Sequence, residues 1–307
     1  MLYNRVLITG ANGLLGQALV TRMSGMPDYD VLATARDDRL KVHGASCGYA
    51  PLDVTDAGAV SNMMEDFAPT VVVNCAAMTQ VDDCETDRER CRRVNAEAVE
   101  TLADECRRAG ARLVQLSTDF VFDGTDGPYA EDARPAPVNY YGKAKLAGEN
   151  AARNAGTGKW AIARTVLVYG TGHALGRSNI LLWLLGELQA GRPVQVVTDQ
   201  IRTPTYVTDL AAGVEKIVRH EASGIYHLAG RELVSVHEFA QTVAEVYGLD
   251  TSLVEETDRT AFTQTAERPP VTGLITLKAE TELSYRPREL RPALRHLRAR
   301  LPTAQGE

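Results

Sequence analysis

Short runs of β-branched residues alternate with amphipathic helical patterns through the first half of the chain. This alternation is typical of βαβ units, whose parallel strands are buried between helices. We therefore expect an α/β fold, a Rossmann-type doubly wound parallel sheet with a ligand at the carboxyl ends of its strands. The strands are predicted at residues 5–9, 30–35, 70–76, 111–117 and 160–167, and the helices at 14–23, 57–67, 82–109 and 141–154.

Beyond Val168 the pattern loosens into separate helices and short strands. The helices are predicted at residues 180–189, 207–220 and 236–247, and the strands at 194–197 and 225–228. This pattern predicts a smaller, interleaved α+β lobe that binds the substrate. We expect residues 1–167 to form the Rossmann domain, completed by about 192–222, and residues 168–191 and 223–307 to form the smaller lobe. Residues 302–307 are expected to fray.

A glycine-rich segment joins the first predicted strand to the first predicted helix, with the spacing Gly-x-x-Gly-x-x-Gly. Glycine permits a tight turn and a close backbone approach, and a helix N-terminus offers free N–H groups and the positive end of a dipole. These properties suit the pyrophosphate of a dinucleotide. The residues expected to bind it are Gly10, Asn12, Gly13, Leu14, Leu15 and Gly16.

Arg36 ends the second predicted strand, where NAD-specific proteins usually place an acidic residue. A guanidinium can form a charge-assisted fork with a 2′-phosphate, which favours NADPH. Because Asp37 and Asp38 follow directly, NADH stays open as the cofactor, and a solvated arginine is the other interpretation. The adenine and ribose pocket is expected at the carboxyl ends of further strands of the sheet, at Asp53, Val54, Cys75, Ala76 and Ala77.

Tyr141 and Lys145 are four residues apart in a predicted helix, which places them on one face. A phenol is a poor proton donor at neutral pH unless a nearby ammonium stabilises its ionised form, and Lys145 supplies that ammonium. Ser117 and Thr118 lie at the end of the strand predicted at residues 111–117. Ser117 is therefore expected beside the cofactor and Thr118 on the substrate carbonyl. Tyr140 has no lysine at this spacing. This set predicts a carbonyl reductase.

In this order, the motifs resemble those of the dTDP-4-dehydrorhamnose reductases, a branch of the extended short-chain dehydrogenase/reductase superfamily. The matching segments are residues 74–82, 94–95, 117–124, 128–131, 139–149, 199–200, 204–205, 209–211 and 268–270. The resemblance implies NADPH-linked reduction of the 4-keto group of a nucleotide-activated deoxysugar, dTDP-4-dehydro-L-rhamnose to dTDP-L-rhamnose. It implies Tyr141 as the acid, Lys145 on the nicotinamide ribose and Thr118 on the carbonyl.

The resemblance also implies further contacts. Thr79 and Asn95 match positions near the cofactor, and we expect the substrate to contact Val81, Thr118, Asp119, Phe120 and Arg202. Two positions depart from the family pattern. Leu167 stands where a tryptophan is expected, which removes an aromatic wall from the sugar pocket. Arg202 replaces a small residue, and it either binds a diphosphate or carboxylate or pairs with Asp199 on the surface.

Three alternative functions share parts of this pattern. A 4,6-dehydratase resembling these enzymes carries Thr-Asp-Glu at this strand end, whereas Phe120 cannot move a proton. An epimerase of a nucleotide sugar would use the same tyrosine and lysine with tightly held NAD, which Arg36 disfavours. The third alternative is a non-catalytic NADP-binding regulatory subunit, since the β subunit of methionine adenosyltransferase resembles this family and shares an arginine near Pro204-Thr205.

Composition limits the partners. The chain has 33 Lys and Arg against 40 Asp and Glu, a formal charge of −7, so we expect neither a nucleic-acid nor a membrane partner. The longest apolar run, residues 180–185, is far below the ~20 residues that span a bilayer, and no signal-peptide pattern is present, which predicts a cytoplasmic protein. The five cysteines lack metal-ligand spacing, so no metal site is expected. The oligomeric state stays open, a homodimer included.

Overall fold

Seven parallel strands form the central sheet of the computed structural model, which describes residues 4–156, 158–176, 179–261 and 265–300. The strand order is β11-β6-β5-β4-β1-β2-β3. The strands are β1 (Asn4–Thr9), β2 (Tyr29–Ala35), β3 (Gly48–Pro51), β4 (Val71–Asn74), β5 (Arg112–Thr118), β6 (Trp160–Thr165) and β11 (Gly224–His227). The order reverses between β1 and β4, and a crevice at the carboxyl ends is expected at such a point. The predicted doubly wound sheet is confirmed.

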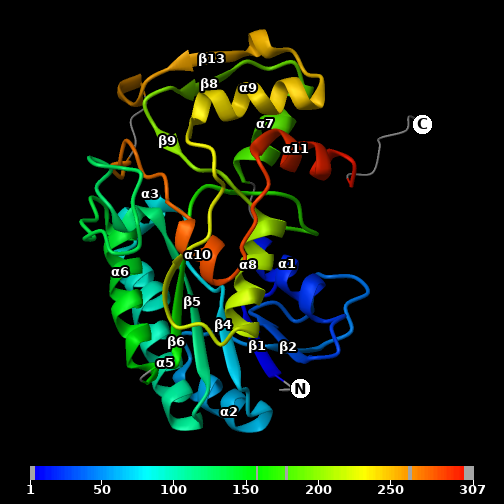
Figure 1. Ribbon diagram of the computed structural model, residues 1–307, viewed down its shortest axis with the longest axis vertical. Coiled ribbons are helices and arrows are strands. Elements are labelled where there is room, and N and C mark those ends of the chain that lie inside the picture. Colours follow the sequence, from blue (N-terminus) through cyan, green and yellow to red (C-terminus); the bar gives the residue numbers. More distant parts are fainter. Residues whose placement is uncertain (1–3, 157, 177–178, 262–264, 301–307) are drawn as a thin grey trace.

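Helices cover both faces of the sheet (Figure 1). On one face lie α1 (Leu14–Met23) and α8 (Val207–Arg219), with α10 (Leu277–Glu282) against β11. On the other face lie α2 (Ala57–Phe67), α5 (Ala98–Ala109) and α6 (Tyr140–Ala152). Residues 302–307, which were expected to fray, lie outside the described residues. No helix of the described part is long and apolar enough to cross a membrane.

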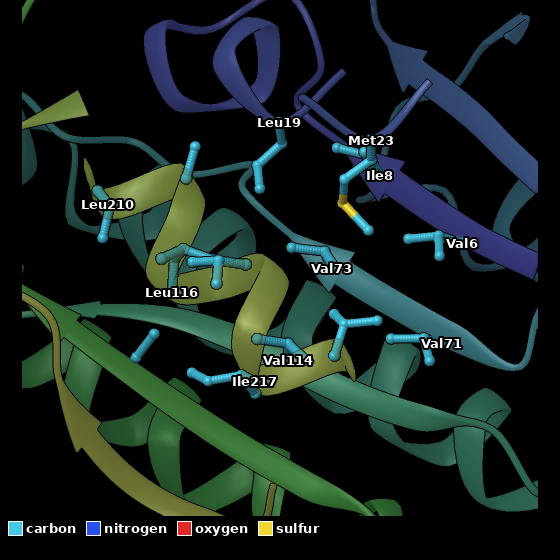
Figure 2. Close-up of a cluster of buried hydrophobic side chains, with 14 of the residues drawn as sticks. Val6, Ile8, Leu19, Met23, Val71, Val73, Val114, Leu116, Leu210 and Ile217 are labelled. Atoms are coloured by element: carbon cyan, nitrogen blue, oxygen red, sulfur yellow. The ribbon is translucent and has the colours of Figure 1, made fainter. Parts of the chain in front are cut away.

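The alternating side chains of the strands divide the core in two. Figure 2 shows the side chains of β1, β4 and β5 that face α1 and α8, and Val73 belongs to the same cluster as Leu19 and Leu210. The residues between them on each strand face the opposite way and pack against α2 and α5, as Leu7 does. A strand whose two faces both pack against helices is apolar along its whole length. This explains the continuous β-branched runs in the sequence.

A smaller lobe lies beyond the carboxyl ends of the sheet, at the top of Figure 1. Its core joins α7 (Ile180–Gln189), α9 (Val236–Tyr247) and α11 (Leu290–Arg298) to β8 (Val194–Val197), which pairs in parallel with β13 (Val254–Thr257). Short ladders connect the lobe to the sheet. They are β7 (Val168–Tyr169) with β10 (Thr205–Tyr206), and β9 (Ile201–Arg202) with β12 (Val234–Ser235). The boundaries of the two lobes given above stay a prediction.

Two expectations from the sequence need correction. The helical pattern over 82–109 is interrupted, as α3 (Val81–Thr86), α4 (Arg88–Arg92), a π-helical turn (Arg93–Glu97) and α5 follow one another. The break occurs because Asp87 ends α3 and then caps α4 by accepting a hydrogen bond from the Arg90 backbone N–H. The strand expected at 225–228 in the smaller lobe is β11, which pairs with β6 and forms the edge of the large sheet.

The buried cluster in Figure 2 predicts the effect of a truncation. Leu19→Ala removes a side chain with no exposed surface, and the lost burial and the remaining cavity should lower the free energy of unfolding by about 2–5 kcal/mol. Urea denaturation measures this change. Leu277→Ala, at a side chain that is 64% exposed, is the control and should stay within about 0.5 kcal/mol of the parent. Equal losses in both variants would contradict the packing described.

Candidate functional site

The carboxyl ends of β1, β2, β4 and β5 open into one cleft of about 1390 Å³, and the smaller lobe forms its opposite wall. Ligand pockets commonly measure about 300–1,000 Å³, so this cleft has room for two ligands side by side. Almost all of the site residues predicted from the sequence line it: Gly10, Asn12, Gly13, Leu14, Leu15, Gly16, Arg36, Asp53, Val54, Cys75, Ala76, Ala77, Thr79, Val81, Ser117, Thr118, Asp119, Phe120, Tyr141, Lys145 and Arg202.

The glycine segment is packed too closely to carry side chains. A Cβ on Gly10 would lie 2.7 Å from the Ala76 nitrogen, and Gly10 has a left-handed φ of 63°. A Cβ on Gly16 would lie 2.3 Å from the Gly10 carbonyl oxygen. Helix α1 begins directly after Gly13, which provides no side-chain cap for the first N–H groups. The segment therefore presents backbone without side chains, together with free helix N–H groups, to a bound anion. A pyrophosphate requires both.

Side chains at the end of β2 organise the next part of the cleft. The Asn12 side chain donates hydrogen bonds to Asp37 Oδ2 (2.8 Å) and to the Arg39 carbonyl, and its oxygen accepts from the Lys41 N–H. The hydrogen bond from Asn12, helped by the Lys41 ammonium 3.4 Å away, lowers the pKa of Asp37. Arg36 and Asp37 are both exposed and both line the cleft, and Oδ2 of Asp37 is already bound by Asn12.

A chain of buried hydrogen bonds crosses the carboxyl ends of three strands. The Thr9 hydroxyl donates to Asn74 Oδ1 (2.5 Å), and the Asn74 amide donates to Gln115 Oε1 (2.8 Å). The Gln115 amide donates in turn to the Leu116 carbonyl, which also accepts from Lys145 Nζ (2.6 Å). Each member finds a partner in the chain, and a satisfied buried network holds its groups in one geometry. Lys145 is therefore fixed relative to the glycine segment.

Tyr141 and Lys145 lie on one face of α6, and both are buried at the bottom of the cleft. Burial lowers the pKa of the Lys145 ammonium to about 8, while the Glu149 carboxylate opposes this shift. Burial raises the pKa of the Tyr141 phenol, and its hydrogen bond with Thr118 acts in the opposite direction. Because burial raises the pKa of the phenol, Tyr141 is neutral and protonated at neutral pH. A protonated phenol beside the Thr118 hydroxyl can donate to a carbonyl oxygen.

A buried ion pair below these residues was missed by the sequence prediction. Arg164, on β6, donates from Nε and Nη2 to the two oxygens of Glu149, at 2.8 Å each. The Ser117 hydroxyl, on β5, donates to the same carboxylate at 2.6 Å. Neither charged side chain is more than 1% exposed. Glu149 stands one turn after Lys145, within the segment that matches the family, and that helical spacing was the available signal.

Asn95 was expected to contact the cofactor, and the structure corrects this. It is buried behind the cleft wall, in the π-helical turn, and does not line the cleft. Its amide donates to the Met78 carbonyl (2.8 Å), and its oxygen accepts from the Met78 N–H (2.9 Å). The Met78 backbone thus binds both ends of the amide, and the amide also donates to Cys91 Sγ (3.4 Å). Asn95 therefore supports the loop that carries Thr79 and Val81, both of which do line the cleft.

Comparison with known proteins agrees with this geometry. A family model described as the RmlD substrate binding domain matches residues 4–302. The chain belongs to the RmlD family. This membership confirms the resemblance to the dTDP-4-dehydrorhamnose reductases that the motifs indicated.

Three proteins similar to the chain carry different names. A dTDP-4-keto-6-deoxy-D-glucose reductase of Streptomyces niveus is 35% identical over 273 residues, which cover 88% of each chain. Methionine adenosyltransferase 2 subunit beta of Xenopus tropicalis is 34% identical over 261 residues, which cover 81% of this chain and 73% of that protein. A dTDP-4-dehydrorhamnose reductase from Bacillus anthracis, crystallised with NADP, has a TM-score of 0.85 at 28% identity and covers 96% of this chain and 99% of its own.

Arg202, one of the two departures from the RmlD family pattern, is 3% exposed. It donates to the carbonyls of Pro269 (2.7 Å) and Pro270 (2.8 Å) and lies 3.8 Å from the Asp119 carboxylate. The surface pair with Asp199 is therefore wrong, because Asp199 instead lies 3.5 Å from Arg259. Arg202 fixes the segment that follows Arg268, and its contact with a substrate anion stays a prediction.

The sequence prediction also missed the wall that the smaller lobe contributes. Asn179, which caps α7, lines the cleft with Ile180 and Trp183 of α7 and with Gln195 and Val197 of β8. Trp183 is 41% exposed although it is a large aromatic residue. The available signal was one tryptophan in an otherwise aliphatic helical pattern at residues 180–185.

The buried ion pair predicts a large loss of stability. Glu149→Gln keeps the size of the side chain but leaves the Arg164 guanidinium buried without its counter-charge, which should lower the free energy of unfolding by about 3–5 kcal/mol. Urea denaturation measures the loss. Glu245→Gln, which breaks an exposed ion pair with Arg291, is the control. It should leave the urea concentration at the midpoint of unfolding nearly unchanged. A small effect of Glu149→Gln would show that α6 does not depend on this pair.

Proposed function

We propose that the protein reduces the 4-keto group of a nucleotide-activated deoxysugar with NADPH, and that its substrate is dTDP-4-dehydro-L-rhamnose, giving dTDP-L-rhamnose. One observation carries the proposal. Thr118, Tyr141 and Lys145 meet in the cleft, beside a glycine segment bare enough for a dinucleotide. The relatives named as dTDP-sugar reductases support the choice of substrate class.

The residues divide the chemistry between them. A bound NADPH would supply a hydride to the carbonyl carbon. Thr118 and Tyr141 would hold the carbonyl oxygen with hydrogen bonds, and Tyr141 would deliver its proton as negative charge develops there. Lys145 would then compensate the phenolate with its ammonium, which is present below about pH 8, and would bind the nicotinamide ribose. The Phe120 ring packs edge-on against the Tyr141 ring, with the ring centroids 6.0 Å apart.

The end of β2 supports NADPH over NADH, which stays open as an alternative. Asp37 lines the same cleft, but its Oδ2 already accepts a hydrogen bond from Asn12 and lies 3.4 Å from the Lys41 ammonium, which compensates part of its negative charge. Arg36 remains at the cleft edge, where a guanidinium can bind a 2′-phosphate. The relative from Bacillus anthracis was crystallised with NADP.

The test of the proposal is the loss of reduced-nicotinamide absorbance when the purified protein meets dTDP-4-dehydro-β-L-rhamnose, with NADPH and NADH compared in parallel. Rapid oxidation of NADPH is expected. No oxidation with this sugar nucleotide, in protein that binds NADPH, would overturn the substrate named here. Other 4-keto sugar nucleotides in the same assay then test the wider substrate class.

The relative from Xenopus tropicalis favours a second candidate, a regulatory subunit that binds NADP and catalyses nothing. The same assay separates the two functions, because a regulatory subunit would bind NADPH without oxidising it in the presence of any keto sugar. The buried and hydrogen-bonded Thr118, Tyr141 and Lys145 weigh against that role, since a binding module has no need of a proton donor here.

Tyr141→Phe tests the proton donor. The variant lacks only the phenol oxygen, so kcat should fall by at least about a hundredfold while NADPH affinity stays close to that of the parent. Steady-state kinetics and NADPH fluorescence titration measure the two quantities. The matched control is Tyr140→Phe, because the Tyr140 ring packs on the Arg88 guanidinium (5.2 Å) outside the cleft lining. Near-normal turnover of Tyr141→Phe would assign the acid to another group.

Arg36→Glu tests how the cofactor is selected. Losing a charge-assisted bond to the 2′-phosphate should lower the kcat/KM ratio of NADPH to NADH by about tenfold or more. Arg39→Glu makes the same change of charge three residues further on, outside the cleft lining, and should leave the ratio nearly unchanged. An unchanged ratio in both variants would mean that the 2′-phosphate is recognised elsewhere.

A further inference from the structure

The far wall of the cleft carries an exposed aromatic side chain that neither the cofactor nor the reacting carbonyl explains. Four large hydrophobic side chains are exposed among the described residues: Trp183, Leu233, Ile275 and Leu277. The last three surround a separate, smaller pocket, whereas Trp183 faces the large cleft from α7. An indole left 41% exposed in a concave site has apolar surface available for a ligand.

The layout of the cleft limits what that ligand can be. The glycine segment, Arg36 and Asp53 account for the end nearest β1, β2 and β3, and Tyr141 with Lys145 marks the reacting centre. Of the walls that remain, the one made by α7 and β8 belongs to the smaller lobe and carries the exposed indole. A nucleotide sugar whose carbonyl lies at Tyr141 extends its nucleoside away from the cofactor, and this wall offers the base an aromatic surface.

The chemistry of the wall fits a flat, polar-edged ring. Trp183 offers a large π face, and stacking of a base on such a ring is worth about 1–3 kcal/mol. Gln195 projects from β8 between two buried valines, is exposed, and lines the same cleft. Its amide carries both donors and an acceptor, which match the alternating N–H and C=O groups on the edge of a nucleobase.

We propose that Trp183 is the stacking platform for the nucleobase of the sugar nucleotide, with Gln195 at the edge of the base. This inference rests on the proposed function for the identity of the ligand. It gives Trp183 a role in binding and none in the chemical step, so truncation should raise KM for the sugar nucleotide and leave kcat nearly unchanged.

Fluorescence provides a direct test, because the chain has only two tryptophans. Trp160 starts β6 at the end of the sheet away from the cleft, where its ring packs on the Arg153 guanidinium (5.6 Å). In protein saturated with NADP, dTDP should quench the emission saturably. Trp160→Phe should keep this quenching and Trp183→Phe should lose it. Quenching that persists in Trp183→Phe would overturn the proposal.

Affinity provides the second readout. Trp183→Ala should weaken dTDP binding, measured by calorimetry, by about tenfold or more, while Trp183→Phe keeps most of it. Inorganic pyrophosphate, which has no base, should bind the parent and Trp183→Ala equally. Unchanged dTDP affinity in Trp183→Ala would refute the stacking role.

The two proposals can fail separately. If dTDP binds through Trp183 but no keto sugar is reduced, the base site stands and the proposed function fails. If a keto sugar nucleotide is reduced and Trp183→Ala leaves its KM unchanged, the proposed function stands and the base site fails.

Discussion

The ion pair between Glu149 and Arg164 is the interaction on which the candidate site depends. It joins α6 to β6, and the Ser117 hydroxyl adds β5 to the same carboxylate. Because both charges are buried, neither side chain can leave the pair without a large desolvation penalty. The ion pair therefore fixes the position and orientation of α6, which carries Tyr141 and Lys145, relative to β5, which carries Thr118.

The second constraint is a chain of hydrogen bonds that runs from strand to strand within the sheet. The hydrogen-bonded chain from Thr9 through Asn74 and Gln115 to the Leu116 carbonyl links the strand before the glycine segment to Lys145. A cofactor held by that segment and a proton donor held by α6 thus share one rigid frame. Such preorganisation matters because small errors in position are costly in catalysis.

Local signals decided how much of this could be predicted from sequence. The bounds of α1, α2, α7 and α9 were predicted correctly, since each has an apolar stripe, and three of them also have a side-chain cap such as that of Asp56 or Ser235. The cleft residues followed from strand ends and spacing. The partner of β11, the Arg164 contact and the exposure of Trp183 depend on residues far apart in the chain, and no local pattern encodes them. Asn95 was misjudged because its motif position gave no sign that the Met78 backbone uses both ends of its amide.

The late position of α8 in the chain has a consequence for biosynthesis. Strands β1, β4 and β5 are complete early, but the apolar face that they present to α1 and α8 is covered only when Leu210 and Ile217 arrive (Figure 2). On the ribosome, the emerging first half therefore keeps a sheet face open until most of the chain has left the exit tunnel. Exposed apolar surface of this kind favours aggregation, so the first half of the chain depends on α8 to complete the cover of its sheet.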